Sequence, residues 1–466
     1  MQRIREMDLT NGPILKKLLI YSIPLILTNI LQILFHTTDI AVLGIMVSDE
    51  AVGAVSANGG LTGLIVGLFV AFSVGTNVVL ARKVGEKDID SAKRTVGTSI
   101  LIAIISGFIL VAIGVPLAEV FLKLMNCDTA ILGMATKYLR IYFLGMPIMM
   151  LYNFSASILR ATGDTKRPLI FLAIGGVANV ILNICFILMG MTVEGVAIGT
   201  ILSQAISATL SLITLFKTKG YGNLNLKHLK LYKKELKEIL HIAVPSALQS
   251  VAFNISNVLI QSTINTFESV GTSANGTAVQ FDNIIYMIGN AIAVATTTFV
   301  GQNVGAKKPD RIKKAIFSAV LLCCTIELAI GLTFAIFAKQ LVGIIADSEE
   351  VIRLATIRLT IMASLYFLCS IMETLANAVR AMGKPVVSLI ISILGASVFR
   401  IIFLKIAFYF VPEFYTIYIS YPVSWIFTIV AYLIFLPIVF KKVKGKMITE
   451  IEREKLTEEA EELTKE

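Results

Sequence analysis

Long runs of apolar residues, separated by short polar stretches, dominate this sequence. Twelve runs have the length of a membrane-spanning helix, about 20 mainly apolar residues each. Their apolar residues are continuous and do not alternate with period 2, which predicts helices and argues against a barrel of strands. The predicted spans are residues 18–44, 52–80, 95–122, 132–159, 168–189, 193–216, 239–265, 272–300, 315–345, 354–379, 386–411 and 416–440.

The composition agrees with this pattern. Of the 466 residues, 56% are hydrophobic and 15% are charged, and the mean hydropathy is +0.82. A soluble globular chain of this size is less apolar. We therefore expect an all-α polytopic membrane protein with twelve transmembrane helices.

The chain also contains an internal duplication. The segment Asn153–Gly163 (NFSASILRATG) recurs 220 positions later as Glu373–Gly383 (ETLANAVRAMG), and an offset of 221 places Pro24 on Pro245. Each half has six spans, an even number, so both halves cross the membrane in the same sense and form parallel repeats. Duplicated apolar halves are typical of transporters, whose substrate site lies between the repeats.

The repeats predict the domain organisation. We expect an N-lobe of helices 1–6 over residues 1–216 and a C-lobe of helices 7–12 over residues 239–440. Residues 217–238 form a linker between them, and residues 441–466 form a charged helical tail. The linker spaces four leucines among lysines, which predicts an amphipathic helix lying on the membrane surface.

The basic residues predict the orientation. Of the 41 Lys and Arg residues, 33 lie in the two terminal arms, the linker and alternate loops. By the positive-inside rule, both termini and the linker are cytoplasmic, and the protein lies in the inner (cytoplasmic) membrane. This distribution explains the net charge of +10. Membrane lipids are therefore the expected partner of the basic loops, and nucleic acid is not. No removed signal peptide is expected.

Several kinds of chemistry find no support in the sequence. The five cysteines lack metal-ligand spacing, and the chain has only three histidines. No HExxH, P-loop or nucleophile-elbow motif is present. We therefore expect neither an enzyme nor a bound cofactor, and any work must draw on an ion gradient.

Polar groups inside the first six spans point to a cation site. A charged side chain at the centre of a spanning helix costs about 2.5–3.5 kcal/mol, so Asp39 is a functional candidate. Asn179 and Asn183 are four apart and share one helix face. Thr200 and Asn153 add further oxygens. This set predicts a proton-coupling site or a sodium site at Asp39, Asn179 and Asn183. Hydrogen bonding between helices is the alternative for the neutral residues.

The second half holds a different set of charges. Its membrane acids are Asp282, Glu327 and Glu373, and Gln280 lies beside the first of them. The cations Arg400 and Lys405 occupy the eleventh span. We expect these two to pair with the acids, because an unpaired buried charge is costly. Either the pairs are structural, or a coupling ion or cationic substrate competes for the same carboxylates.

The motifs as a set resemble the multidrug and toxic compound extrusion (MATE) family over nearly the whole chain. They are DIAVLG around Asp39, VGEKDIDSAKR and VGAKKPDRIKKA, LRATGDTKRP and VRAMGKP, and NVILN in the fifth span. The resemblance implies two lobes in a V around a central cleft and drug export driven by sodium or proton entry. It also implies that Asp39 is the coupling acid. Some relatives carry an acid where this chain has Asn183. The seventh span lacks the acid typical of NorM, so the chain resembles the DinF or Firmicutes-type branches more.

We therefore expect a monomeric secondary antiporter that exports amphipathic, cationic compounds in exchange for sodium ions or protons. The alternative within the wider superfamily is a lipid-linked oligosaccharide flippase, which Arg400 and Lys405 would suit if both face the cleft. A gradient-independent channel or a membrane receptor is the alternative from another class. The sequence does not name the substrate.

Overall fold

The computed structural model describes residues 7–463, and every regular element in that range is a helix. The chain divides into two units, Met1–Ile255 and Ser256–Glu466, with the division inside α8. The helices of the first unit are α1 (Ile14–Met46), α2 (Asp49–Glu86), α3 (Ile89–Leu124), α4 (Thr129–Leu144), α5 (Met146–Ala161), α6 (Lys166–Leu188), α7 (Val193–Lys217), η1 (Leu226–His228) and the first part of α8 (Lys233–Ile264).

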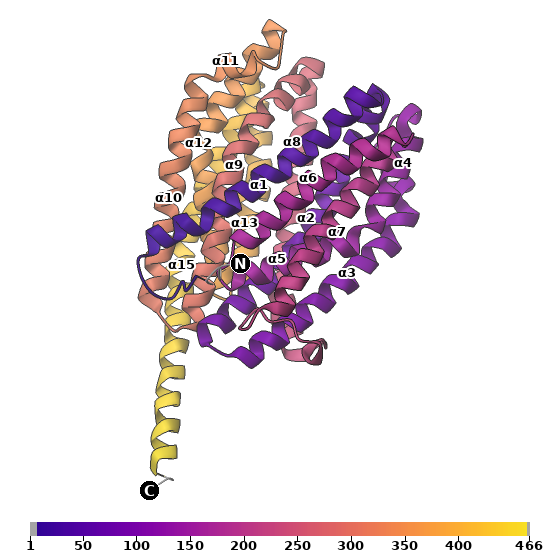
Figure 1. The fold of residues 1–466 in the computed structure, drawn as a ribbon. Coiled ribbons are helices and arrows are strands. Elements are labelled where there is room, and N and C mark those ends of the chain that lie inside the picture. Colours follow the sequence, from indigo (N-terminus) through magenta and orange to yellow (C-terminus); the bar gives the residue numbers. More distant parts are fainter. Residues whose placement is uncertain (1–6, 464–466) are drawn as a thin grey trace. The chain divides into compact units, whose positions relative to one another are not determined.

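The second unit begins in α8 and continues to the end of the chain (Figure 1). It contains a π-helix, η3, between α13 and α14. Its elements after α8 are η2 (Asn265–Phe267), α9 (Glu268–Gly305), α10 (Pro309–Ile336), α11 (Ala338–Val342), α12 (Glu349–Ala381), α13 (Pro385–Ser392), η3 (Ile393–Phe399), α14 (Arg400–Phe410) and α15 (Phe414–Leu463).

The spans predicted from the sequence are consistent with these helices. Among the described residues, nine helical segments are long and apolar enough to cross a membrane, or ten if the bent pair α4 and α5 is one span. One of the nine, Lys233–Gly305, contains both α8 and α9, and α2 is a further helix of 38 residues. The bend of 50° between α4 and α5 falls at Gly145 and Pro147, because proline cannot donate the backbone hydrogen bond that a straight helix needs.

The two halves of the duplication repeat the same packing and the same turns. Helices α2, α3 and α5 pack on one another, as do their counterparts α9, α10 and α12. Gly163 and Gly383 both have positive φ, 94° and 82°, and each ends a helix in the left-handed conformation that glycine favours. Lys87 and Lys307 also match, with φ of 59° and 53°. The repeat therefore preserves backbone conformation as well as sequence.

The prediction of an amphipathic surface helix over residues 217–238 is wrong. After α7 only the short 3₁₀ turn η1 forms before α8 begins at Lys233, and Leu226 and Leu231 are exposed. Gly220 and Gly222 precede this turn, and glycine disfavours helix because its unfolded backbone is freer. The four leucines therefore do not form the apolar stripe that was expected of them.

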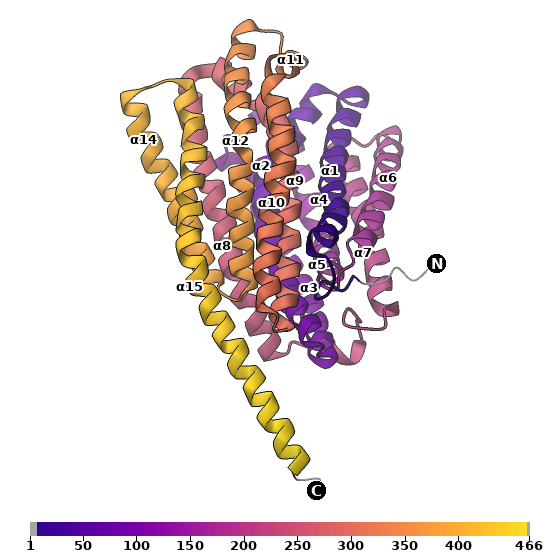
Figure 2. The same cartoon turned by 90° about the vertical axis from the view of Figure 1, so that its left-hand side faces the viewer.

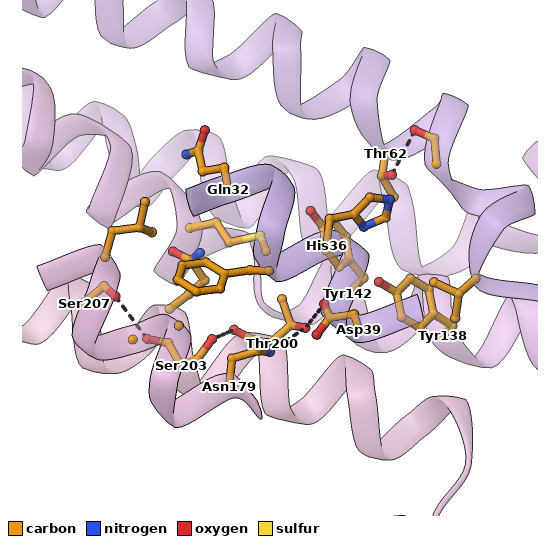
Figure 3. A pocket seen from close by; sticks show the side chains of 18 residues that line it. Gln32, His36, Asp39, Thr62, Tyr138, Tyr142, Asn179, Thr200, Ser203 and Ser207 are labelled. Carbon is orange, nitrogen blue, oxygen red and sulfur yellow. Dashed lines mark hydrogen bonds between the residues drawn. The ribbon is translucent and has the colours of Figure 1, made fainter. Parts of the chain in front are cut away.

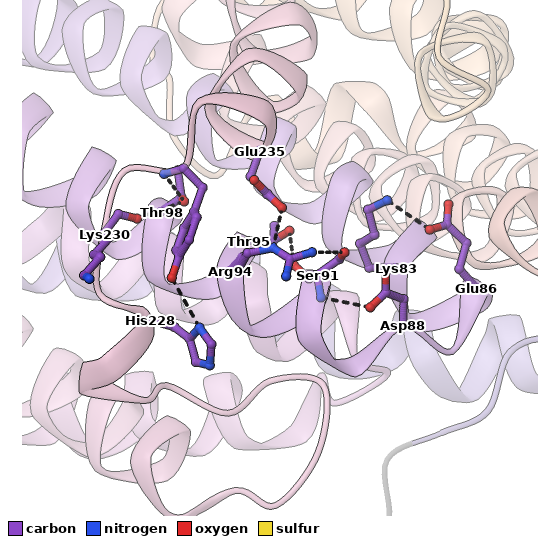
Figure 4. Close-up of polar contacts among 11 residues, drawn as sticks. Lys83, Glu86, Asp88, Ser91, Arg94, Thr95, Thr98, His228, Lys230 and Glu235 are labelled. Atoms are coloured by element: carbon purple, nitrogen blue, oxygen red, sulfur yellow. Dashed lines mark hydrogen bonds and ion pairs between the residues drawn. The ribbon is translucent and has the colours of Figure 1, made fainter.

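This connection is instead held against α3 (Figure 4). Thr98 Oγ1 donates to the Lys230 carbonyl at 3.2 Å and accepts from the Tyr232 amide at 3.3 Å. Arg94 Nε donates to Glu235 Oε1 at 2.9 Å, and this hydrogen bond raises the pKa of Arg94. The connection is thus part of the first unit. The boundaries 216 and 239 given to the lobes stay a prediction.

The predicted helical tail is present through Leu463, as the end of the 50-residue helix α15. Figure 2 shows α15 continuing past α10 and α12 of its own unit. Lys307 forms an ion pair with Glu454 of the tail, and Lys313 Nζ lies 4.7 Å from the centre of the Phe440 ring. Residues 464–466 of the predicted tail lie outside the described residues.

Candidate functional site

A cavity of about 170 Å³ lies in the first unit among α1, α2, α4, α5, α6 and α7 (Figure 3). Polar and aromatic side chains line it together with small residues. The lining residues are Gln32, Phe35, His36, Asp39, Val55, Gly59, Thr62, Tyr138, Tyr142, Met149, Leu172, Gly175, Gly176, Asn179, Thr200, Ser203, Gln204 and Ser207. The cavity therefore contains Asp39, Asn179 and Thr200, three of the five residues that the sequence assigned to a cation site.

Asp39 is the only acid in this lining, and it is 7% exposed. Asn183 Nδ2 donates to its Oδ1 at 2.6 Å. Thr200 Oγ1 lies 3.3 Å from Oδ2 and 2.9 Å from the Val196 carbonyl, so its single proton serves one of these acceptors at a time. Within the described part of the chain, no Lys or Arg forms an ion pair with Asp39.

The two asparagines of α6 complete this cluster. Asn179 Nδ2 lies 3.4 Å from Thr200 Oγ1, so α6 contacts both α1 and α7 through side-chain amides. Both asparagines are buried, and the Oδ1 atom of each has no hydrogen-bond partner. A buried carbonyl oxygen without a partner is costly. A cation bound in the cavity would satisfy the oxygen of Asn179, which lines it.

Glycines allow the three helices to come this close. A Cβ atom at Gly176 would overlap the ring of Phe35 on α1, and one at Gly199 would overlap the Asn183 carboxamide. One at Gly175 would overlap the Ser207 hydroxyl on α7. These contacts hold Asn183 against Asp39.

The sequence prediction missed other residues of the cavity. His36 lies one turn before Asp39 on α1 and is exposed to the cavity. Tyr138 and Tyr142 of α4 stack with ring centres 6.0 Å apart. The i, i+3 spacing of His36 and Asp39 was a usable signal. The tyrosines gave none, because aromatic residues at helical spacing are more often core.

Asn153 does not join this cluster. Its Nδ2 donates to the Met149 carbonyl of its own helix at 2.9 Å, and it does not line the cavity. The placement of Asn153 beside Asp39 is therefore corrected. A carboxamide within a helix can bond to the carbonyl four residues before it, and here that local partner wins over a contact across helices.

In the second unit, Asp282 of α9 pairs with a residue that the sequence prediction did not select. Arg358 Nη1 of α12 lies 2.9 Å from Asp282 Oδ2, and both side chains are buried. The geometry is that of an ion pair without a hydrogen bond, since both oxygens of Asp282 lack hydrogen-bond partners. Gln280 is exposed, whereas Asp282 is buried. Residues two apart on a helix point in different directions.

Glu327 and Glu373, the other two membrane acids named for this unit, have neutral hydrogen-bond partners. Ser370 Oγ of α12 donates to Glu327 Oε1 of α10 at 2.7 Å, and Glu327 Oε2 is buried without a hydrogen-bond partner. Asn290 Nδ2 of α9 lies 3.5 Å from Glu373 Oε2. A Cβ atom at Gly289 would overlap Glu327, so glycine lets α9 approach this carboxylate. Two carboxylates that form no ion pair in the described range thus lie among α9, α10 and α12.

Arg400 and Lys405 do not pair with these acids, which corrects the expectation from the sequence. Arg400 is buried, and its Nε donates to Ser424 Oγ of α15 at 2.8 Å. Lys405 is exposed, five residues before the end of α14. A lysine at that distance can extend its ammonium to the membrane surface. No acid in the described range forms an ion pair with either cation.

Comparisons with known proteins agree with the duplication and the fold. A family model described as MatE matches the chain twice, over residues 24–185 and 245–406. The probable multidrug resistance protein YoeA of Bacillus subtilis is 25% identical over 447 residues, covering 93% of this chain and 95% of YoeA. An FAD transporter of Shewanella oneidensis is 23% identical over 399 residues, covering 83% of this chain and 86% of that transporter. A solved outward-facing structure of a multidrug resistance MATE family transporter of the MOP superfamily has a TM-score of 0.85 at 22% identity. The match covers 96% of this chain and 99% of that transporter.

Proposed function

Because its two halves each match the MatE model, the chain belongs to the MATE family of membrane transporters, and we propose that it is a secondary active antiporter. It exports amphipathic, cationic drugs or toxic compounds in exchange for sodium ions or protons by alternating access. It lies in the cytoplasmic membrane as a monomer, with both termini in the cytoplasm. The names of relatives such as YoeA support the cargo class.

The carboxylate of Asp39 carries this proposal. It is buried in a spanning helix, it has two neutral hydrogen-bond partners, and no Lys or Arg neutralises it in the described residues. A membrane carboxylate of this kind is unstable without a cation. It therefore binds a sodium ion or a proton and releases it when the cavity faces the other side. The residues beside it at this site are Asn179, Asn183 and Thr200.

The size of the cavity limits what it holds. Drug-sized ligands occupy sites of about 300–1,000 Å³, whereas this cavity is about 170 Å³. In this conformation it accommodates an ion together with one ring or headgroup of a cargo. Tyr138 and Tyr142 give it aromatic faces, which attract an organic cation. Cargo and coupling ion thus compete for the same carboxylate, and this competition produces exchange.

Of the second-unit acids, Glu373 is the candidate for contact with a cationic cargo. Asp282 is already neutralised by Arg358, so we assign that pair to the stability of the lobe. Glu373 has the neutral hydrogen-bond partner Asn290 and forms no ion pair in the described range. The flippase alternative is not favoured, since the named relatives concern drugs and FAD. Binding of ethidium without binding of a lipid-pyrophosphate headgroup analogue would exclude it.

The proposal is tested by Asp39→Asn in purified protein reconstituted in liposomes. We expect loss of ion-driven ethidium transport, because the neutral amide no longer alternates between a cation-bound and a cation-free charge. Asp49→Asn is the matched control, an exposed acid at the start of α2, and it should transport like wild type. Wild-type transport by folded Asp39→Asn protein would overturn the role of Asp39.

A further inference from the structure

Arg400 is a buried cation whose charge the described residues do not neutralise. It is 4% exposed and begins α14, inside the membrane-spanning segment Pro385–Phe410. A guanidinium has five N–H donors, and the only hydrogen bond described for Arg400 is from Nε to Ser424 Oγ. Its two terminal amino groups therefore remain available for an anion.

Aromatic rings of α15 surround this guanidinium. Its central carbon lies 4.4 Å from the centre of the Tyr421 ring and 6.0 Å from that of Trp425. Residues 421, 424 and 425 share one face of α15. Trp425, the single tryptophan of the sequence, also lies 5.4 Å from the Tyr366 ring of α12. Cation–π contacts reduce the cost of burying the charge, but they supply no counter-charge.

The same unit contains a second buried arginine that lies beside a tyrosine of α15 and, unlike Arg400, also has a carboxylate partner. Arg358 is also buried, and its guanidinium lies 5.1 Å from the ring of another α15 residue, Tyr418. There the carboxylate of Asp282 lies 2.9 Å from the arginine. Arg358 and Arg400 thus each lie beside a tyrosine of α15, and of the two only Arg358 has a carboxylate partner in the described residues. At Arg400 no described carboxylate occupies the corresponding place.

The backbone before Arg400 adds an independent observation. Residues Ile393–Phe399 form the π-helix η3, directly before α14. Such segments are uncommon in α-helices and occur often at functional sites. One inserted residue rotates everything after it by about 100° around the helix axis, so η3 determines the face on which Arg400 lies. It also gives α14 a place to bend when the nearly closed site admits a ligand.

We propose that Arg400, Tyr421 and Trp425 form a C-lobe subsite for the acidic group of an aromatic substrate. A carboxylate or sulfonate pairs with the terminal amino groups of Arg400, since guanidinium and such anions match in a bidentate geometry. The substrate's rings contact Trp425 and Tyr421. The inference rests on the proposed export function and extends its cargo to aromatic amphiphiles that carry an acid.

The test compares two aromatic dyes of opposite charge in liposomes that contain the full-length protein. 8-Anilinonaphthalene-1-sulfonate is the anionic dye, and ethidium is the cationic one. We expect Arg400→Gln to lower transport of the anionic dye more than tenfold and that of ethidium less than twofold. Lys405→Gln, an exposed cation on the same helix, should change neither dye more than twofold.

The possible outcomes separate the two proposals. Transport of ethidium but not of the anionic dye by wild type would overturn the subsite and leave the export function standing. Transport of neither dye would overturn the export function. Equal loss of both dyes in folded Arg400→Gln protein, or loss of neither, would show that Arg400 is structural. If Arg400→Gln does not fold, Arg400→Lys is the variant to compare with wild type. Lysine keeps the positive charge but lacks the planar guanidinium that pairs with an anion through two hydrogen bonds. An unchanged ratio of the two dyes would then overturn the subsite.

Discussion

Asn183 and Asn153 are both asparagines within spanning helices of the first unit, yet their side chains have different partners. Asn183 donates to the Asp39 carboxylate, whereas Asn153 donates to a carbonyl of its own helix. We expect Asn183→Ala to lower ion-driven ethidium efflux about tenfold or more, because a hydrogen bond to a charged group contributes about 1.5–3 kcal/mol. Asn153→Ala should remain within twofold of wild type. Equal rates for the two variants would contradict the role of Asn183.

The sequence predicts residues well where the signal is local. Asn179 and Asn183 lie four apart, so helix periodicity alone places them on one face, and the structure brings Asn183 to Asp39. It predicts poorly where the partner comes from another helix. Arg358 was missed because nothing near it in the chain indicates Asp282, and Arg400 was wrongly paired because opposite charge alone does not determine which helices meet.

At the scale of elements, the repeated ends of α5 and α12 provide a test of backbone conformation. Gly163 has φ of 94°, and a Cβ atom there would overlap the backbone of Met7. An alanine at that φ costs about 1–2 kcal/mol before any overlap is counted. We expect Gly163→Ala to lower the midpoint of thermal unfolding in detergent by several degrees.

The matched control for that change is Gly133→Ala. Gly133 lies in α4, and a Cβ atom added there would have no heavy atom within 4 Å. Alanine in a helix interior is favoured over glycine by about 0.5–1 kcal/mol, so the unfolding midpoint should stay the same or rise. A midpoint for Gly163→Ala as high as that of Gly133→Ala would show that the left-handed turn is not required.

The duplication made the elements predictable because each half provides a second copy of the same pattern. The bend at Pro147 could be expected, since proline interrupts the hydrogen bonds of a helix. The π-helix before Arg400 could not, because Ile393–Phe399 reads as an ordinary apolar helical run. The prediction of a surface helix in the linker 217–238 failed for a related reason. Spaced leucines suggested a helix, whereas the glycines at 220 and 222 and the contacts with α3 determine its path.

For the molecule as a whole, the all-α class and the family predicted from the sequence are confirmed. The DinF-like branch, the lobe boundaries and the orientation in the membrane stay predictions. The family could be recognised because its motifs recur in order over both halves. The coupling ion could not, since sodium and a proton use the same carboxylate and differ only in the ligands around it.

We predict that the coupling ion is sodium, from the groups that surround Asp39. A proton needs only the carboxylate of Asp39, whereas the buried Oδ1 atom of Asn179, which lines the cavity, lacks a partner and suits a cation with several oxygen ligands. In liposomes at equal pH on both sides, we expect a sodium gradient alone to drive ethidium in the opposite direction. A pH gradient without sodium should drive less. Transport driven only by the pH gradient would assign the site to protons, and flux that ignores both gradients would indicate a channel.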